Sequence, residues 1–233
     1  MSRLAILASL PLLLLPACRG ATRPIDRPSP SPPAHEDEIR LTILDDRLRQ
    51  AYEILLERSP SFRSAAELFE TGPVKITIGY AESFPHDRYR GHFTGLAAIF
   101  PGESLQLPHG EPLDSLHVVF FTRRLEQVAI EQMGVPEKEV ITDLAILLAH
   151  ELYGHVASLS REQSPRWPPP CRDPHWTEGG LGCAGEAENL IRRELGISPR
   201  ASHMKIDLLF VCVAMPVQCE RLRAALPSQS EQR

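Results

Sequence analysis

The chain has 233 residues, and its 25 Lys and Arg against 30 Asp and Glu give a formal net charge of -5 at pH 7. This charge is mild, and the sequence has no basic patch with interleaved aromatic residues, so we expect no nucleic-acid partner. The sequence also has no internal repeat, and no second linker divides it after the N-terminal segments. One main domain is therefore expected.

Residues 1–18 have the composition of an export signal. Arg3 supplies the positive charge, the apolar run LAILASLPLLLL follows it, and a small residue precedes Cys18. The apolar run is too short for a lasting membrane span. We therefore expect these residues to be an export signal that is not part of the fold.

The end of this segment, Leu15-Pro16-Ala17-Cys18, resembles a bacterial lipobox, although Pro16 is not the usual occupant of its position. The resemblance implies that Cys18 becomes the lipidated first residue of the mature protein. The protein would then be lipid-anchored to a membrane of the bacterial cell envelope and would face the periplasm or the exterior. Plain cleavage at the same site is the alternative.

Residues 19–37 are rich in Pro and Ser and poor in large apolar groups, which predicts an extended tether. A disordered tail without a spacing role is the alternative. The remaining residues, 38–233, are enough for one compact domain with a sizeable core.

Hydrophobic periodicity in this domain predicts an α+β fold. We expect strands at residues 74–80 and around 92–100 and 116–122, which would form a small antiparallel or mixed sheet. The C-terminal run 206–217 is shorter than a membrane span and is read as a core strand or buried helix. The expected helices are residues 38–58, 61–70, 125–132, 137–158 and 184–195.

Three ionisable residues interrupt the apolar helical run LAILLAHELYGHVAS at residues 144–158: His150, Glu151 and His155. Two imidazoles can ligate Zn²⁺ together with a third protein ligand from elsewhere. The Glu beside the first His can accept a proton from metal-bound water. The alternative is that these are buried or helix-end residues with ordinary hydrogen bonds.

The two histidines are five residues apart, whereas the common zinc-protease motif H-E-x-x-H places them four apart. On an ideal α-helix, five residues would turn His155 roughly 140° away from His150. A one-residue π-bulge absorbs such an insertion, and the backbone deforms at low cost at Gly154. We therefore predict a local helix distortion between Glu151 and His155.

The six residues HELYGH resemble the H-E-x-x-G-H motif of the dipeptidyl peptidase III family, in which the longer spacing binds catalytic zinc. The match covers only these residues, and the chain is far too short to be that enzyme.

The expected helix at 184–195, AGEAENLIRREL, offers a third ligand. Glu188 lies at the edge of its apolar face, whereas Glu186 points further toward solvent. We choose Glu188 as the third metal ligand and keep Glu186 as the reserve. A surface pair between Glu188 and Arg192 is the alternative, and neither Asn189 nor Arg192 is assigned a catalytic role.

Two segments carry a second resemblance: HELYGH, and ENLIRRELG followed by Arg200. They are similar to the zinc metallopeptidase domains of secreted effector and Rhs-type toxin proteins, which have H-E-L-G-H and then E-N-x-x-R-x-E-L-G. The resemblance implies a zincin-like fold, peptide hydrolysis, and zinc bound by His150, His155 and a downstream Glu, with Glu151 as base. The chain departs from this pattern by one residue inserted in the helix, a shorter approach to Glu-Asn, and its lipoprotein signal.

Four cysteines follow Cys18, and an even number in an exported chain suggests two disulfides with three possible pairings. We prefer the pairings with short loops, and a Cys-rich zinc site is the rival interpretation, although no C-x-x-C spacing supports it. The preferred pairs are Cys171 with Cys183 and Cys212 with Cys219.

The proline-rich loop at 163–182 contains Trp167, His175 and Trp176 and is expected near the cleft. It either lines a substrate groove or packs as a surface loop. His175 and His203 are minor candidates for a fourth ligand or a transition-state donor. Tyr153 could donate to an oxyanion, in a direction that depends on the predicted bulge.

Together these features predict a membrane-tethered, zinc-dependent hydrolase with a small zincin-like α+β domain, in which a short sheet packs against the metal-bearing helix. Its substrate would be a peptide or protein. Zinc held by His150, His155 and Glu188 would activate water, and Glu151 would be the catalytic base. The alternative is a non-catalytic lipoprotein in which a structural zinc or polar site supports a binding surface.

Overall fold

The computed structural model describes residues 40–84, 89, 95–102, 112–162, 164–166, 168–171, 173 and 180–200. All of them belong to one compact unit, Glu38–Arg233. Several predictions concern residues outside these ranges, and they stay predictions: the export signal with Cys18, the tether at 19–37, Trp167, His175, Trp176, His203, the Cys212–Cys219 pair and the run at 206–217.

Within the described residues, four strands form one mixed sheet in the order β1-β2-β4-β3. Strands β1, β2 and β4 are parallel neighbours, and β3 runs antiparallel to β4. β3 is therefore an edge strand of this sheet. The strands are β1 (Leu41–Ile43), β2 (Lys75–Tyr80), β3 (Ala97–Pro101) and β4 (Ser115–Phe120).

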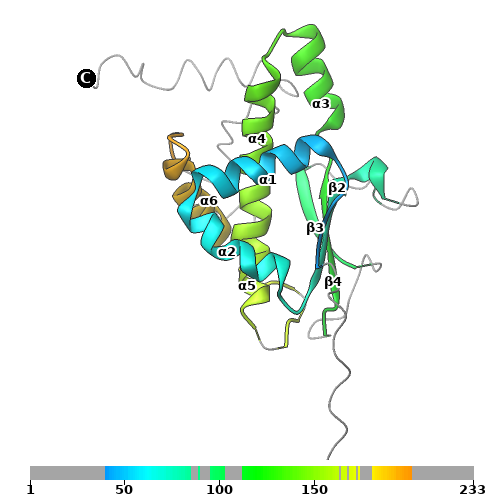
Figure 1. Ribbon diagram of the computed structural model, residues 1–233, viewed down its shortest axis with the longest axis vertical. Coiled ribbons are helices and arrows are strands. Elements are labelled where there is room, and N and C mark those ends of the chain that lie inside the picture. The colour runs from blue at the N-terminus through cyan, green and yellow to red at the C-terminus, as the bar shows by residue number, and fades with distance from the viewer. Residues whose placement is uncertain are drawn as a thin grey trace, which may run out of the picture. The chain divides into compact units, whose positions relative to one another are not determined.

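The helices pack against one face of the sheet, so the described chain has a helical layer and a sheet layer (Figure 1). This confirms the predicted α+β fold class with its small mixed sheet. The helical elements are α1 (Asp46–Arg58), α2 (Pro60–Glu70), the short turn η1 (Ala81–Ser83), α3 (Arg123–Gln127) continued by η3 (Val128–Gln132), α4 (Glu137–Ala149), η4 (His150–Val156), α5 (Ala157–Ser160) and α6 (Gly182–Glu194).

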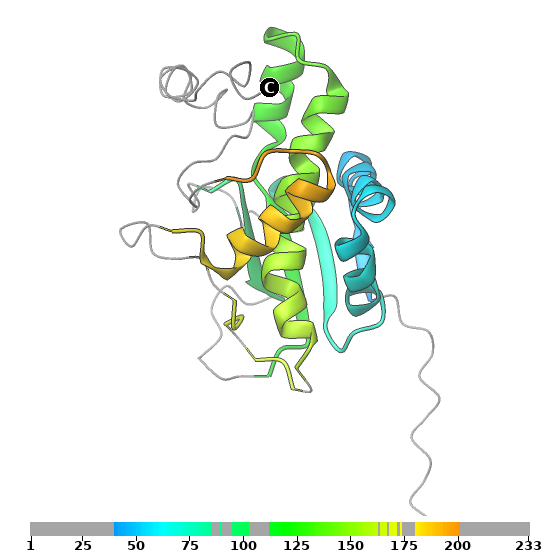
Figure 2. The ribbon, with the colours of Figure 1, turned by 90° about the vertical axis from the view of Figure 1, so that its left-hand side faces the viewer.

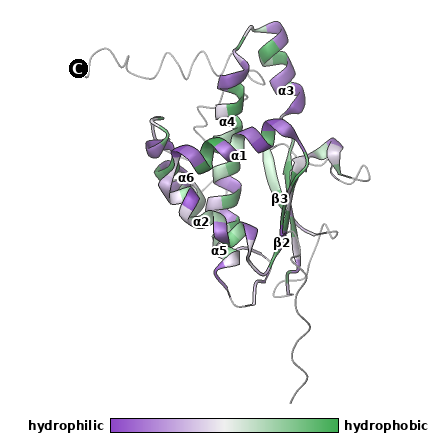
Figure 3. Ribbon diagram, in the orientation of Figure 1, coloured by the Kyte–Doolittle hydropathy of each residue, from purple (hydrophilic) through white to green (hydrophobic). Residues whose placement is uncertain are grey.

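The centre of the fold is a continuous helix, Glu137–Ser160, formed by α4, η4 and α5. Its 24 residues are long and apolar enough to cross a membrane, but most of them are buried in the domain. Figure 3 shows hydrophobic residues along this helix, which lies among the other helices and beside the sheet. The same core includes Leu55 from α1, Phe69 from α2 and Val118 from β4. The apolar run around the motif therefore belongs to a protein core.

The prediction of a helix starting at residue 38 is wrong in its first part. Leu41–Ile43 form β1, paired in parallel with Ile76–Ile78 of β2. The helix begins only after Asp45, whose carboxylate accepts a hydrogen bond from the backbone N–H of Arg47 at 3.0 Å. A three-residue strand is too short to establish the alternation of apolar and polar residues that is typical of strands. Its apolar residues therefore also fit the helical spacing of the segment that follows.

Among the described residues, the other predicted helices and strands are confirmed, with ends that differ by a few residues; of the strand expected around 92–100, the described part forms β3 (Ala97–Pro101). Pro60 does not only close the first helix; it is also the first residue of α2, where its missing N–H costs no hydrogen bond. The adjacent Ser59 caps α2 by accepting from the N–H of Phe62 at 3.1 Å.

The C-terminal end of α6 is fixed to the junction between α1 and α2. The hydroxyl groups of Ser59 and Ser61 both donate to the carboxylate of Glu194. Arg58 donates to the carbonyl oxygen of Leu195 at 2.9 Å. Burial raises the pKa of Glu194, but the hydrogen bonds from the two serines outweigh it and leave the pKa below its usual value. This anchor holds α6 in place over the central helix.

Candidate metal centre

The candidate metal-binding motif lies in a π-helical segment of the central helix. Residues His150–Val156 form η4, in which the backbone N–H of Ala157 donates to the carbonyl oxygen of Leu152, five residues earlier. A turn of this width brings residues five apart onto one face. The rings of His150 and His155 consequently lie with their centroids 5.0 Å apart. The predicted helix distortion is confirmed.

Gly154 has a different role from the one expected. Its φ is not positive, so the distortion does not use the backbone freedom of glycine. Instead, α6 crosses the central helix at this point, as the two views of the ribbon show (Figures 1 and 2). A Cβ atom on Gly154 would lie 2.9 Å from the Cβ and 3.0 Å from the Cα of Ala184. Glycine is required here for close helix packing.

We expect Gly154→Ala to destabilise the protein by about 1 to 3 kcal/mol, because the new methyl group meets backbone atoms that can only move with the whole of α6. That movement should also weaken metal binding, since α6 carries Glu188. Urea unfolding and zinc titration of the variant measure the two effects. Gly95→Ala is the matched control, because the nearest atom to its added Cβ is a carbonyl oxygen at 3.4 Å. Equal stability of both variants would contradict the packing role.

The Nε2 atoms of both imidazoles point toward one carboxylate, that of Asp173. His150 Nε2 lies 3.3 Å from Asp173, and His155 Nε2 lies 3.5 Å from it. Ligand atoms bound at about 2.0 to 2.1 Å to a tetrahedral zinc ion are about 3.3 to 3.4 Å apart. One ligand atom from each of the three residues lies within 4.8 Å of the others. The three side chains therefore fit one metal ion with little rearrangement.

The other nitrogen of each imidazole is held by an acceptor from the protein. His150 Nδ1 lies 3.0 Å from Glu188 Oε2, and His155 Nδ1 lies 2.8 Å from the carbonyl oxygen of Cys171. Arg200 also lies 3.2 Å from His150 Nδ1, but its closer partner is the Glu188 carboxylate at 2.7 Å. Both acceptors therefore favour a hydrogen on Nδ1, which leaves Nε2 as the nitrogen available to a metal ion. Acceptors of this kind fix the tautomer and orientation of metal-binding histidines.

Glu188 is itself fixed by two buried arginines. Arg200 lies 2.7 Å from Glu188 Oε2, and Arg192 lies 3.2 Å from Glu188 Oε1. Asn189 closes the network: its side chain donates to the carbonyl oxygen of Arg200 and accepts from the N–H of Arg200, at 2.9 and 2.8 Å. The chain after α6 is thereby folded back so that Arg200 reaches the site. The exposed Glu188–Arg192 pair considered from sequence is thus a buried, three-membered ion-pair network.

The structure brings together His150, Glu151, His155 and Glu188. The position of Glu188 differs from that expected of a third ligand beside the two Nε2 atoms. Glu188 is buried as expected, with 2% of its surface exposed, and it lies on the Nδ1 side of His150. The reserve candidate Glu186 is exposed. The carboxylate on the Nε2 side belongs to Asp173, which sequence reasoning missed. Its one available signal was its position two residues after a cysteine expected to be disulfide-bonded.

Electrostatic interactions within the metal-free site favour protonated histidines. Burial lowers the pKa of His150, but hydrogen bonds with Asp173 and Glu188 outweigh burial and raise it to about 10. The pKa of His155 is raised in the same way, mainly by Asp173. Burial raises the pKa of Asp173, yet the two histidines lower it far below its usual value. Without metal, each Nε2–H donates to Asp173, and a metal ion would replace these two protons.

A cleft of about 310 Å³ opens next to the two histidines. Glu151 lines it together with His155 and Asp173, and only 7% of the surface of Glu151 is exposed. Burial raises the pKa of Glu151; the two histidines oppose this shift, and the Asp173 and Glu188 charges add to it. A buried carboxylate at the side of a candidate metal site is the arrangement that a general base requires.

The walls of the cleft come from two other parts of the fold. Ala97, Ala98 and Ile99 of the edge strand β3 line it, and so do Pro168 and Pro169. Of the two roles considered for the proline-rich loop, its described part therefore lines the groove.

Tyr153 does not line this cleft. Its side chain is half-buried and lines a separate cavity of about 510 Å³ with residues of α2 and Arg161. The structure therefore gives no support for Tyr153 as an oxyanion donor.

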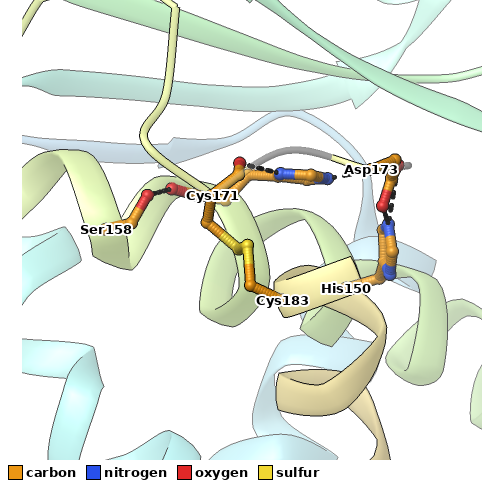
Figure 4. The surroundings of a disulfide bond; sticks show 6 residues. His150, Ser158, Cys171, Asp173 and Cys183 are labelled. Carbon is orange, nitrogen blue, oxygen red and sulfur yellow. Dashed lines mark hydrogen bonds and ion pairs between the residues drawn. A yellow bond between two sulfur atoms is a disulfide. The ribbon is translucent and has the colours of Figure 1, made fainter. Parts of the chain in front are cut away.

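The predicted disulfide between Cys171 and Cys183 is confirmed. It joins the segment that carries Asp173 to the first turn of α6. Figure 4 shows this disulfide and the carboxylate of Asp173 turned toward His150.

In comparisons with known proteins, no family model matches this chain, and no curated protein or solved structure matches it either.

Proposed function

We propose that this chain is a zinc-dependent hydrolase, a peptidase, in which His150, His155 and Asp173 bind the metal and Glu151 is the general base. The observation that carries the proposal is the convergence of both Nε2 atoms on Asp173, at 3.3 and 3.5 Å, while both Nδ1 atoms are held by protein acceptors. A purely structural ion pair would not need this oriented pair of imidazoles. Glu188 as third ligand, the expectation from sequence, stays a prediction; its contacts support an orienting role.

His150, His155 and Asp173 would hold the zinc ion, since two histidines and one carboxylate are a ligand set of catalytic zinc sites. When bound, zinc would supply a Lewis acid that acidifies water and polarises a carbonyl group. Glu151 accepts the proton of the attacking water and returns it to the leaving amine. Glu188, with Arg192 and Arg200 behind it, keeps His150 in the orientation that this chemistry needs.

The cleft supports a peptide as the substrate. Ala97–Ile99 belong to an edge strand of the described sheet, and they border the cavity that contains Glu151 and His155. An extended peptide can add to a sheet edge through its backbone N–H and C=O groups. A scissile bond in such a peptide would pass the metal position. The lipid anchor predicted at Cys18 would place this activity at a membrane of the cell envelope.

One observation favours a second, non-catalytic function. The distances between the two histidines and Asp173 also fit contacts of protonated imidazoles with a carboxylate, an arrangement that needs no metal ion. In that case the cluster would stabilise a binding surface of a lipoprotein, and Glu151 would have no chemical role.

Metal content separates the two functions. We expect about one zinc ion per chain in the purified full chain, measured by elemental mass spectrometry after zinc is supplied and excess metal is removed. His155→Ala removes one ligand and should lose the zinc, while Glu186→Ala, an exposed residue of α6, is the matched control and should keep it. A folded wild-type protein without zinc would contradict the enzyme proposal and leave the polar cluster.

A further inference from the structure

We propose that the Cys171–Cys183 disulfide is a thiol–disulfide exchange site, and that its reduction by a dithiol lowers the affinity of the site for metal. The inference rests on the proposed metal binding and adds a mode of regulation to it. The disulfide joins two parts of the chain that each hold one of the histidines: the segment of Cys171 contacts His155, and α6 contacts His150.

The short stretch from Pro168 to Asp173 contributes three groups to the site. Pro168 and Pro169 form a wall of the cleft, the carbonyl oxygen of Cys171 accepts from His155 Nδ1, and Asp173 meets both Nε2 atoms. The described residues of this stretch, 168–171 and 173, have no helical or strand structure, so their conformation depends on how the stretch is attached to the rest of the fold.

One attachment lies upstream of this stretch and one within it. Upstream, the N–H of Leu113 donates to the carbonyl oxygen of Pro165 at 3.0 Å, and Arg166 forms an isolated β-bridge with Pro112. Within the stretch, the disulfide from Cys171 to Cys183 fixes it to α6, the helix that also carries Glu188. Among the described residues, this covalent bond holds the Asp173 side of the stretch at a set distance from the helix behind His150.

The two sulfur-bearing residues differ in exposure. Cys171 is 8% exposed, whereas Cys183 is an exposed residue in the first turn of α6. A thiolate from solution therefore reaches the sulfur of Cys183 more readily. A dithiol attacks that sulfur, a mixed disulfide forms at Cys183, and Cys171 leaves as a thiolate that takes up a proton. The second thiol of the reductant then attacks the reductant's first sulfur in the mixed disulfide, and Cys183 leaves as a thiolate that takes up a proton. The protein gains two electrons, and the dithiol becomes a cyclic or linear disulfide.

Reduction should loosen the Asp173 stretch without unfolding the domain. The bond closes a loop with a sequence separation of only 12 residues, and its loss returns conformational freedom to that loop. The position of α6 does not depend on this bond alone, because Glu194 fixes the C-terminal end of the helix and the contact of Ala184 with Gly154 fixes its first turn. Asp173 and the Cys171 carbonyl would then have to be ordered again when metal binds.

The test is a zinc titration of the full chain in three states: oxidised, reduced by a dithiol that is then removed under anaerobic conditions, and reoxidised. Competition with a chromophoric chelator gives the zinc affinity, and circular dichroism reports the fold. We expect reduction to lower zinc affinity about 10- to 100-fold, the range seen when partners that orient metal ligands are lost. Reoxidation should restore the affinity.

Variants show which cysteines are responsible. Cys183→Ser should reproduce the reduced state and make affinity independent of the dithiol, whereas the double variant Cys212→Ser, Cys219→Ser should still respond to it. With a monothiol, mass spectrometry should find the mixed disulfide on Cys183.

Three results would overturn the inference. Equal zinc affinity in the oxidised and reduced states would show a disulfide that does not act on the site, and the proposed function would survive. Global unfolding on reduction would show a purely structural bond. Absence of zinc from the oxidised protein would overturn the proposed function as well.

Discussion

Glu151→Gln is expected to lower kcat/KM for peptide hydrolysis by about 100- to 10,000-fold, the range that a positioned general base contributes, while one zinc ion stays bound. Gln has nearly the size of Glu and can occupy the same place in the cleft, but it cannot accept the proton of water. The substitution also removes a carboxylate that burial disfavours, so the folded protein should not lose stability.

Three measurements on this variant decide the question: zinc content, thermal unfolding, and cleavage of an unstructured peptide library followed by mass spectrometry. Glu186→Gln is the matched control, because Glu186 lies on α6 but is exposed to solvent. A Glu151→Gln protein that contains zinc and cleaves peptides at the wild-type rate would rule out Glu151 as the base.

The second large effect concerns the carboxylates on the two sides of His150. Asp173→Ala should lower zinc affinity by more than about 100-fold, because it removes a proposed ligand, whereas loss of an orienting group costs about 10- to 100-fold. Its cost in stability should be small, since the side chain of Asp173 is 33% exposed.

Compared with Asp173→Ala, Glu188→Ala should lower the stability of the protein more and its zinc affinity less. It leaves Arg192 and Arg200 buried without the carboxylate between them, and breaking a buried ion pair costs about 3 to 5 kcal/mol. Zinc affinity should fall by about 10- to 100-fold only. Urea unfolding without metal measures the free energy of unfolding of both variants, and zinc titration measures their zinc affinity. If Glu188→Ala loses more zinc affinity than Asp173→Ala, Glu188 is the third ligand, as the sequence pattern predicted.

The parts of the site that sequence reasoning predicted are those that local geometry determines. The five-residue spacing of His150 and His155 on a buried helix can place both rings on one face only through a wider turn, and η4 provides it. The burial of Glu188 followed from its place on the apolar face of α6 in the same way.

The parts that were missed depend on contacts between distant segments. Asp173 reaches the histidines because a disulfide and a stiff proline run hold its segment. The hydrophobic periodicity of the sequence does not predict this position. Arg200 arrives through the two hydrogen bonds of Asn189, and the role of Gly154 depends on which helix crosses it. Such contacts become predictable only when the packing of the elements is known.

The anchor of α6 at Glu194 has a consequence for how the protein folds. Glu194 meets Ser59 and Ser61 across a separation of more than 130 residues, so the chain must close a very long loop before this contact forms. The sheet and the first two helices precede the motif in sequence, whereas α6 and Asp173 follow it. During synthesis, the proposed metal site would be assembled last. Zinc uptake by a refolding chain should therefore lag behind the recovery of helix, and it would report the final docking step.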